Sequence, residues 1–477
     1  MLAALVFLLA CLVPSQARAQ ANYDGVNLGG RTAMMGGAGV ARGSDGATAF
    51  INPAGLARIP GESFSFSTFA VELATRKVEG QLDPNGALDL ASNDATSISV
   101  GLLPQTFCLF LDGPPRDHTT VRSRHKYGMC AQDTEGDTFL FANNVRNPGE
   151  DAGISQTTRL RWAKSTLALA WALQLLPETA IGVTVRADAS RLEDHSSTTT
   201  FTPSGTGTDL YTLDQTRTSV SWDVGVTVGL THQISRFATL GASLSSPSQH
   251  VYGYHDGTEA FHTSDGNINT LVQDVGGFRY SPPANLRLGL GFAWPGFNFE
   301  VDASYYGSSA QLAVASFDRF VVGNVNGVPL GGGPTQKREI VERAQPVVNF
   351  MVGAETFVSR DFSIMLGAQT DFSALPTRVE GDPANVLFRQ ARDVFHGSIG
   401  VASYRSSGAL ILGLRGFYAT GSVLSAGPPS TNPTFVAFPQ TEWSVSLVVS
   451  GQISFEAVRD AALRAATPLL SDPKGNK

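Results

Sequence analysis

The sequence has few charged residues and, beyond its first twenty residues, no long hydrophobic run. Asp, Glu, Lys and Arg make up 16% of the 477 residues, well below the roughly 25% that is usual in soluble domains. No later stretch approaches the roughly 18 consecutive apolar residues that a membrane-spanning helix needs. Any membrane-spanning part of the mature chain must therefore be built from strands.

The first nineteen residues, 1–19, predict a secretory signal peptide. Residues 2–13 are almost wholly apolar, and Pro14 and the small-x-small site at 17–19 follow them. This segment is too short to span a bilayer, although it lacks the usual basic start. A lipoprotein cleavage box ending at Cys11 is the alternative, but only ten residues precede that cysteine and none is basic. We expect the mature chain to begin at Gln20.

Cysteine and basic residues are also scarce. Of three cysteines, Cys11 belongs to the leader, which leaves Cys108 and Cys130. Export to an oxidising compartment permits a disulfide between them, although their spacing does not establish one. The formal net charge of −7 and the lack of a basic run argue against nucleic acid as a partner.

Motifs that carry chemistry are missing as well. The sequence contains no Gly-x-Ser-x-Gly, no His-Glu-x-x-His and no phosphate-binding Gly-Lys-Ser/Thr loop, so we predict no enzymatic activity, no catalytic residues and no cofactor. The spacing of His250, His255 and His262, in a predicted long loop, matches no standard metal site, and we predict no metal. Five acidic residues alternate onto the polar faces of predicted strands and indicate a hydrated, charge-paired interior: Asp223, Glu300, Asp302, Glu355 and Asp371.

What the sequence has in abundance is alternation with a period of two, from about residue 62 onward. In "WDVGVTVGL" (222–230) the apolar residues fall on one face, and Asp, Gly and Thr fall on the other. "LRLGLGF" (286–292) and "FNFEVDASY" (297–305) follow the same pattern. Such segments predict strands with one apolar and one polar face.

The length of these segments and of their connections separates a membrane barrel from a soluble sandwich. Many segments run nine to fifteen residues, and short connections at 294–296, 360–361 and 406–408 alternate with long polar ones. The long connections are predicted at 189–216, 253–277, 307–344, 374–391 and 421–440. This asymmetry is typical of outer-membrane barrels. We predict an all-β transmembrane barrel of about 14 antiparallel strands over residues 61–455, whose third strand lies, poorly defined, within 116–142.

The segment ahead of the barrel fits no regular element. "DGATAFINPAGLARIP" (45–60) is rich in Gly and Ala, and Pro53 and Pro60 interrupt any helix or strand. Small residues allow irregular backbone to pack inside a barrel, one of the few places where such backbone is tolerated at membrane depth. The alternative is a surface turn before the first strand.

The stretch "GGRTAMMGGAGVARGSDGATAFINPAGLARI" (29–59) resembles the N-terminal hatch of the long-chain fatty acid transporter (FadL/TodX-like) family of outer-membrane proteins, which includes channels for toluene-like hydrocarbons. The matching residues are Gly30, Arg31, Gly36, Gly37, Ala38, Asp45, Asn52, Pro53 and Ala54. The resemblance implies that residues 20–60 form a hatch plugging the lumen on its periplasmic side. It also implies a bacterial outer-membrane location.

The sequence departs from the family in two places. Family members end on the aromatic residue of the last strand, whereas residues 456–477 follow Phe455 here and predict a periplasmic tail. The family also has a kinked third strand whose gap faces the lipid, but the polar 112–150 region cannot be aligned with it residue by residue.

Apolar residues on otherwise polar strand faces bear on the cargo. They are either a substrate-binding lining or contacts for the hatch: Met351, Phe357, Met365, Ile411, Phe417 and Val448. With the resemblance, they predict a channel for long-chain fatty acids or other small hydrophobic compounds, which pass by diffusion. A polar-solute porin and a barrel enzyme acting on lipids are the alternatives. The expected partners are a hydrophobic small molecule, outer-membrane lipid and the barrel assembly machinery, and we expect a monomer.

Overall fold

The computed structural model describes residues 22–23, 29–80, 95–114, 124–146, 153–204, 207–331, 336–375, 387, 390–405, 407–426 and 435–456. The predicted signal peptide (1–19) lies outside these residues, as does all of the predicted tail except Glu456. No helix in the described ranges is long and apolar enough to cross a membrane.

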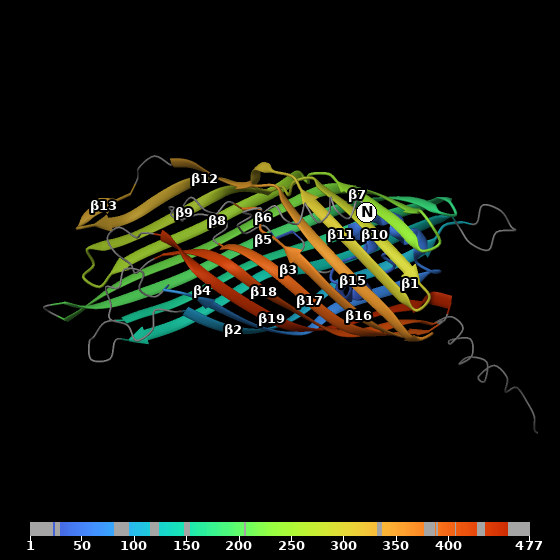
Figure 1. Ribbon diagram of the computed structural model, residues 1–477. Helices are drawn as coiled ribbons and strands as arrows, with labels where there is room; N and C mark the ends of the chain where they lie inside the picture. Colours follow the sequence, from blue (N-terminus) through green and yellow to red (C-terminus); the bar gives the residue numbers. More distant parts are fainter. Residues whose placement is uncertain are drawn as a thin grey trace, which may run out of the picture.

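The described strands form one antiparallel sheet that closes on itself (Figure 1). They are β1 (Ser63–Val78), β2 (Ala95–Asp112), β3 (His125–Arg146), β4 (Gly153–Leu176), β5 (Thr179–Ser204), β6 (Gly207–Gln233), β7 (Ala238–Ser245), β8 (Gln249–Thr263), β9 (Ile268–Tyr280), β10 (Asn285–Trp294), β11 (Phe297–Tyr306), β12 (Ser309–Val325), β13 (Val328–Leu330), β14 (Gln336–Ala344), β15 (Val347–Ser359), β16 (Phe362–Asp371), β17 (Gln390–Arg405), β18 (Gly408–Ala426) and β19 (Phe435–Ser454).

These elements make fourteen passages along the barrel wall within the described residues. β7 and β8, β9 and β10, β11 and β12, and β14 and β15 each continue one passage after a short break, and β13 forms a small hairpin with β12. Pairing of β1 with β19, from Ser63↔Ser454 to Val78↔Gln440, closes the ring. The predicted all-β barrel of about 14 antiparallel strands is confirmed.

The two faces of the wall follow the alternation in the sequence. On β10, Leu286, Leu288 and Leu290 point outward, and Leu288 is 50% exposed because no protein covers it. On the neighbouring β11, Glu300 and Asp302 are buried inside the ring. An apolar outer surface and a largely polar interior are the arrangement of a transmembrane barrel.

Four of the predicted long loops are wrong, because strands occupy most of 189–216, 253–277, 307–344 and 421–440. Most of the fifth, 374–391, lies outside the described residues. β5 and β6 stay paired as far as Ser204↔Gly207, and β8 pairs with β9 across 255–276. Runs such as Thr198–Thr200 are polar yet favour extended backbone, and they pair as strands where both faces can be polar. Long hairpins therefore extend one end of the barrel, and short turns lie at the other (Figure 1). The third strand, predicted within 116–142, runs from His125 to Arg146.

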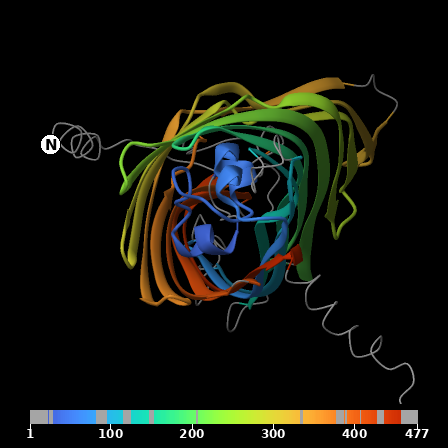
Figure 2. The same cartoon turned by 90° about the vertical axis from the view of Figure 1, so that its right-hand side faces the viewer.

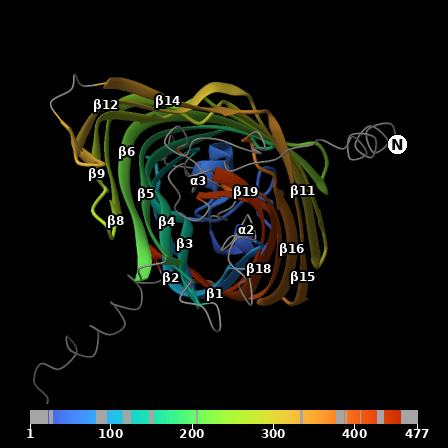
Figure 3. The ribbon, with the colours of Figure 1, turned by 90° about the vertical axis from the view of Figure 1, so that its left-hand side faces the viewer.

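Residues 29–60, here called the N-terminal segment, lie inside the ring (Figures 2 and 3). They contain two short helices, α2 (Gly30–Met34) and α3 (Thr48–Ile51), and the 3-10 helix η1 (Pro53–Arg58). The segment contacts wall residues close to the short turns, among them Gly182 near the β4–β5 turn and Gly367 near the β15–β16 turn. It therefore occupies the lumen at the short-turn end.

Candidate functional site

Two buried carboxylates of β11 hold the backbone of the N-terminal segment. Oδ2 of Asp302 accepts hydrogen bonds from the N–H groups of Gly39 and Val40 at 2.7 and 2.9 Å. Oε1 of Glu300 accepts from those of Ala41 and Arg42 at 2.6 and 3.1 Å. These side chains, expected to face cations, satisfy irregular backbone that has no strand partner.

Arg31 ties α2 to β15, the strand that pairs with β11 in the wall. Its Nε lies 3.0 Å from Oε2 of Glu355 on β15, and both side chains are buried. Glu355 also accepts hydrogen bonds from Ser363 and Tyr404 at 2.9 and 2.7 Å. Removing one member of a buried pair leaves the other charge uncompensated, which costs about 3–5 kcal/mol.

Asn52 joins two parts of the N-terminal segment to each other and to β6. Its Nδ2 donates to the carbonyls of Val40 at 2.7 Å and Leu230 at 3.0 Å, and its Oδ1 accepts from the N–H of Ala54 at 3.2 Å. Pro53 follows as the first residue of η1, where its missing N–H costs nothing. Asn52 is fully buried, so the alternative of a surface turn does not describe its position.

Asp45 joins α2 to the residues just before α3 through hydrogen bonds. Its carboxylate accepts hydrogen bonds from the N–H and the hydroxyl of Thr32 at 2.8 and 2.9 Å, and from the N–H of Ala47 at 3.1 Å. Burial raises the pKa of Asp45, and the bonds from Thr32 oppose that shift. Gly36 and Gly37 turn the chain after α2 with φ of 65° and 85°, a region that favours glycine.

Glycines of the wall form the other half of this contact, and the sequence reasoning missed them. A Cβ on Gly182 would lie 2.4 Å from the carbonyl carbon of Pro53, and one on Gly353 would lie 2.4 Å from the carbonyl oxygen of Met35. Gly241 meets the carbonyl oxygen of Val40 in the same way, at 2.2 Å. Glycine inside a strand often marks the close approach of another backbone. The glycines within the predicted strands could therefore have pointed to this contact.

Four of the six apolar interior residues pack against the N-terminal segment. Met351, Met365, Ile411 and Val448 form one buried cluster with α2 and the residues after it: Ala33, Met34, Met35 and Ala38. The other two lie apart. Phe357 is next to Tyr404, with ring centroids 5.9 Å apart, and Phe417 is next to His396, at 5.7 Å. The structure therefore shows Met351, Met365, Ile411 and Val448 as contacts for the N-terminal segment.

A larger apolar cluster lies farther from the short turns. We call it the upper cluster; its buried members are Val78, Leu192, Phe278, Tyr280, Tyr306, Leu312, Ala313, Ala315, Phe317, Ile340, Ala344, Val347, Ala374, Leu375, Leu387, Val423 and Phe438. Trp162 packs edge-on against Tyr280, with centroids 4.7 Å apart, and Tyr23 stacks on Tyr306 at 4.3 Å. These residues are buried although no lipid surrounds the chain, so they face the interior.

The barrel wall is split between β2 and β3. Their register covers only Thr106–Asp112 against Lys126–Gln132. Beyond Thr106, the described part of β2 pairs with β1 alone, while the described part of β3 beyond Gln132 pairs with β4 alone. Pro104, which has no N–H to donate, lies two residues past the last pair. A bulge in β3 between Glu135 and Asp137 bends the strand at the same level.

The upper cluster reaches this split through Trp162. On β4, Trp162 lies opposite Asp137 of β3, directly at the bulge. Its ring meets Tyr280 across the lumen side of the wall. One aromatic side chain therefore connects the apolar interior with the place where the wall is unpaired.

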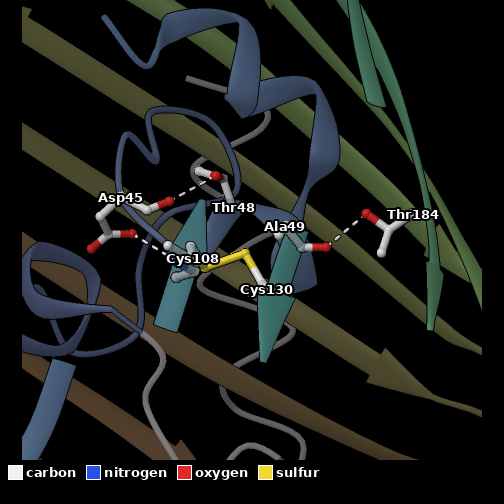
Figure 4. Close-up of a disulfide and its surroundings, with 8 residues drawn as sticks. Asp45, Thr48, Ala49, Cys108, Cys130 and Thr184 are labelled. Atoms are coloured by element: carbon white, nitrogen blue, oxygen red, sulfur yellow. Dashed lines mark hydrogen bonds between the residues drawn. A yellow bond between two sulfur atoms is a disulfide. The ribbon is translucent and has the colours of Figure 1, made fainter. Parts of the chain in front are cut away.

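A disulfide joins Cys108 and Cys130 just below the split (Figure 4). The two residues are directly opposite each other in the β2–β3 register, and both are buried. Around them, Thr48 donates to the carbonyl of Asp45 at 2.8 Å, and Thr184 donates to that of Ala49 at 2.7 Å. The disulfide thus lies at the boundary between wall and N-terminal segment.

The histidines expected in a long loop lie on β8. Nδ1 of His255 is 2.7 Å from the hydroxyl of Ser219, and Nδ1 of His250 is 3.2 Å from both Ser221 and Asp223. Ser221 also donates to Asp223 and accepts from the N–H of Tyr280. Its hydroxyl is therefore engaged in hydrogen bonds that join β6 to its neighbours. The described residues include no group of three side chains placed to hold a metal ion.

Comparison with solved structures agrees with this architecture. No family model and no curated protein sequence matches the chain. A Pseudomonas aeruginosa FadL homologue is similar over 90% of this chain and 99% of its own, with a TM-score of 0.57 and 13% identity. The Ralstonia pickettii toluene transporter TbuX is similar over 91% of this chain and 100% of its own, with a TM-score of 0.57 and 13% identity. The P. putida toluene transporter TodX is similar over 91% of this chain and 99% of its own, with a TM-score of 0.57 and 14% identity.

The chain has the FadL/TodX fold. The likeness extends over almost the whole length of each solved structure, and the identities are low. The resemblance seen in "INPAG" and its flanking glycines is thereby confirmed at the level of the fold.

Proposed function

We propose that this protein is a bacterial outer-membrane channel through which small hydrophobic compounds, long-chain fatty acids among them, pass by diffusion. The observation that carries the proposal is the upper cluster. It places Phe278, Tyr280, Leu312 and Phe317 together inside a barrel whose interior is otherwise largely polar. A channel for sugars or ions has no use for such a surface, whereas an alkyl chain or an aromatic ring is stabilised by it.

The size of the effect is sufficient for binding. Burying ten methylene groups of an alkyl chain is favourable by about 0.8 kcal/mol each, before the cost of ordering the chain. A net several kcal/mol corresponds to binding in roughly the micromolar to millimolar range. That range allows a solute to be taken up from dilute solution and still be released.

The direction of exit follows from what is bonded and what is not. The N-terminal segment is held to the wall by Asp302, Glu300 and Glu355, so the path toward the short turns is obstructed. In their described parts, β2 and β3 share no ladder bonds beyond Thr106↔Gln132, and Trp162 lies beside this split. We infer that the solute leaves sideways through this split, and that residues 20–60 act as a hatch.

Tyr23 packs against the upper cluster, where we expect the solute to bind. Its ring stacks on Tyr306, and Nδ2 of the preceding Asn22 donates to the carbonyls of Asp371 and Arg392 at 2.6 and 3.2 Å. Its own hydroxyl is buried and has no hydrogen-bond partner among the residues that the structure describes. A bound solute would displace an aromatic ring that is poorly satisfied there, which lowers the net cost of entry.

Native mass spectrometry of the purified protein tests the proposal. We expect co-purified or added oleate to be retained by the wild type and lost, about tenfold more readily, from Phe278→Ser/Phe317→Ser, because roughly 1.4 kcal/mol of apolar contact is removed. Val275→Ser/Phe320→Ser is the matched control, since these outward-facing side chains belong to the same strands β9 and β12. Equal retention by both variants would place the binding site elsewhere.

A further inference from the structure

We propose that the Cys108–Cys130 disulfide is a stop that limits how far β2 and β3 separate. It keeps the barrel wall closed beside the N-terminal segment while the wall above it stays open. The inference rests on the proposed function only in treating the split as the exit; the stop itself is a property of the wall.

The seam between β2 and β3 is short. It consists of seven residue pairs, Thr106–Asp112 with Lys126–Gln132, whereas β3 and β4 pair along nearly all of β3. Ladders fray from an open end, because each lost pair frees both strands for the next. The disulfide lies at the third pair from the open end, where it arrests fraying after Thr106↔Gln132 and Phe107↔Ala131.

The disulfide lies in the upper part of the surface on which the N-terminal segment rests. Cys108 Sγ lies 3.6 Å from the carbonyl oxygen of Gly46, and a Cβ on Gly46 would lie 3.0 Å from that sulfur. Below it, residues of α3 and η1 pack on the same seam; the cluster contains Ala49, Leu56, Ile59, Cys108, Phe110, Cys130, Ala168, Ala170 and Ala172. Further separation of β2 and β3 would split this surface in two.

The lower end of the seam has its own tie. Nζ of Lys126 lies 2.8 Å from Oδ1 of Asp112, the last pair of the register, and it also donates to the carbonyl of Gly61. The seam is thus held at its closed end by an ion pair and near its open end by a covalent bond. A covalent bond is suited to the open end, because it does not exchange with water as a hydrogen bond or ion pair does.

The test compares the wild type with Cys108→Ala/Cys130→Ala in planar bilayers and by amide hydrogen exchange. Alanine fits the small buried sites without adding an unsatisfied polar group. We expect exchange in residues 107–112 to be roughly tenfold faster, and single-channel conductance to be about twofold higher or more, in a barrel that keeps its heat-modifiable mobility. A disulfide that served only global stability would speed exchange equally in strands far from the seam, such as β10 and β11, and would leave the conductance of the folded protein unchanged. That result would overturn the proposal.

A shifted clamp provides the matched control. Thr106→Cys/Gln132→Cys in the double-alanine background moves the cross-link two residues along the same face of the two strands. We expect wild-type exchange and conductance to return. If the double-alanine protein does not fold, the shifted clamp still decides: it should fold and remain closed, and an unfolded or leaky shifted-clamp protein would contradict the stop.

These measurements do not involve a hydrophobic solute. Failure of oleate retention would therefore count against the proposed cargo and not against the stop. Unchanged exchange and conductance would count against the stop and not against the cargo.

Discussion

Gly36 and Gly367 approach so closely that a Cβ on Gly367 would lie 2.0 Å from the amide nitrogen of Gly36. Gly36 follows α2 in the lumen and Gly367 lies on β16 of the wall. Backbone meets backbone here with no side chain between, and the same holds at Gly353 and Met35. The N-terminal segment fits the barrel because the wall has glycines where the segment touches it.

Gly353→Ala/Gly367→Ala should displace the N-terminal segment. Each added methyl group overlaps backbone that cannot move without breaking its own bonds, and overpacking of this kind costs about 1–3 kcal/mol per site. We expect higher single-channel conductance in planar bilayers from a barrel that still folds. Gly397→Ala on β17 is the control, since nothing lies within 4 Å of its added Cβ. Equal conductance in all three proteins would mean that the close contacts do not hold the segment.

Asn52→Ala/Pro53→Gly should loosen the N-terminal segment from within. The change removes the hydrogen bonds from Asn52 to Val40 and Leu230, at about 1 kcal/mol each, and frees the start of η1. The barrel should keep its heat-modifiable mobility on gels, because no strand pairing is touched. Conductance should rise, and a conductance identical to that of the wild type would contradict the role of Asn52 as a tie.

Met365→Ser/Ile411→Ser tests whether these interior apolar residues hold the N-terminal segment or bind the solute. Both side chains pack on α2 and the residues after it, so their loss should raise conductance and leave oleate retention unchanged. Phe417→Ser serves as the comparison, because Phe417 contacts His396 and lies outside that cluster. Loss of oleate retention in the double variant would show that these residues line the binding site after all.

The orientation of the barrel follows from its two ends. An epitope tag in the turn at 264–267 of the β8–β9 hairpin should bind antibody on intact cells, because long hairpins face outward in outer-membrane barrels. A tag at Arg360–Asp361, in the short β15–β16 turn, should bind only after the cells are opened. Labelling of intact cells at 360–361 would reverse the orientation.

The sequence predicted the barrel because alternation, as in 222–230 and 286–292, reports directly which side chains face outward. It failed at 189–216 and 253–277, where polar strands beyond the membrane look like loops, since both of their faces can be polar. The N-terminal site was predicted from Asn52, Asp45 and the flanking glycines. Its wall partners Gly182, Gly353 and Gly367 were not, because a contact between distant segments leaves only an unexplained glycine in the sequence. The split at Thr106↔Gln132 depends on pairing, which one strand alone does not encode.

Uptake of oleate by cells that lack their own transporter tests the central claim most directly. The wild type should restore uptake, Phe278→Ser/Phe317→Ser should reduce it sharply, and Val275→Ser/Phe320→Ser should not. In liposomes that carry the purified wild type, small sugars should cause swelling only at background rates. Rapid swelling in sugar without any oleate uptake would contradict the account and identify a polar-solute porin.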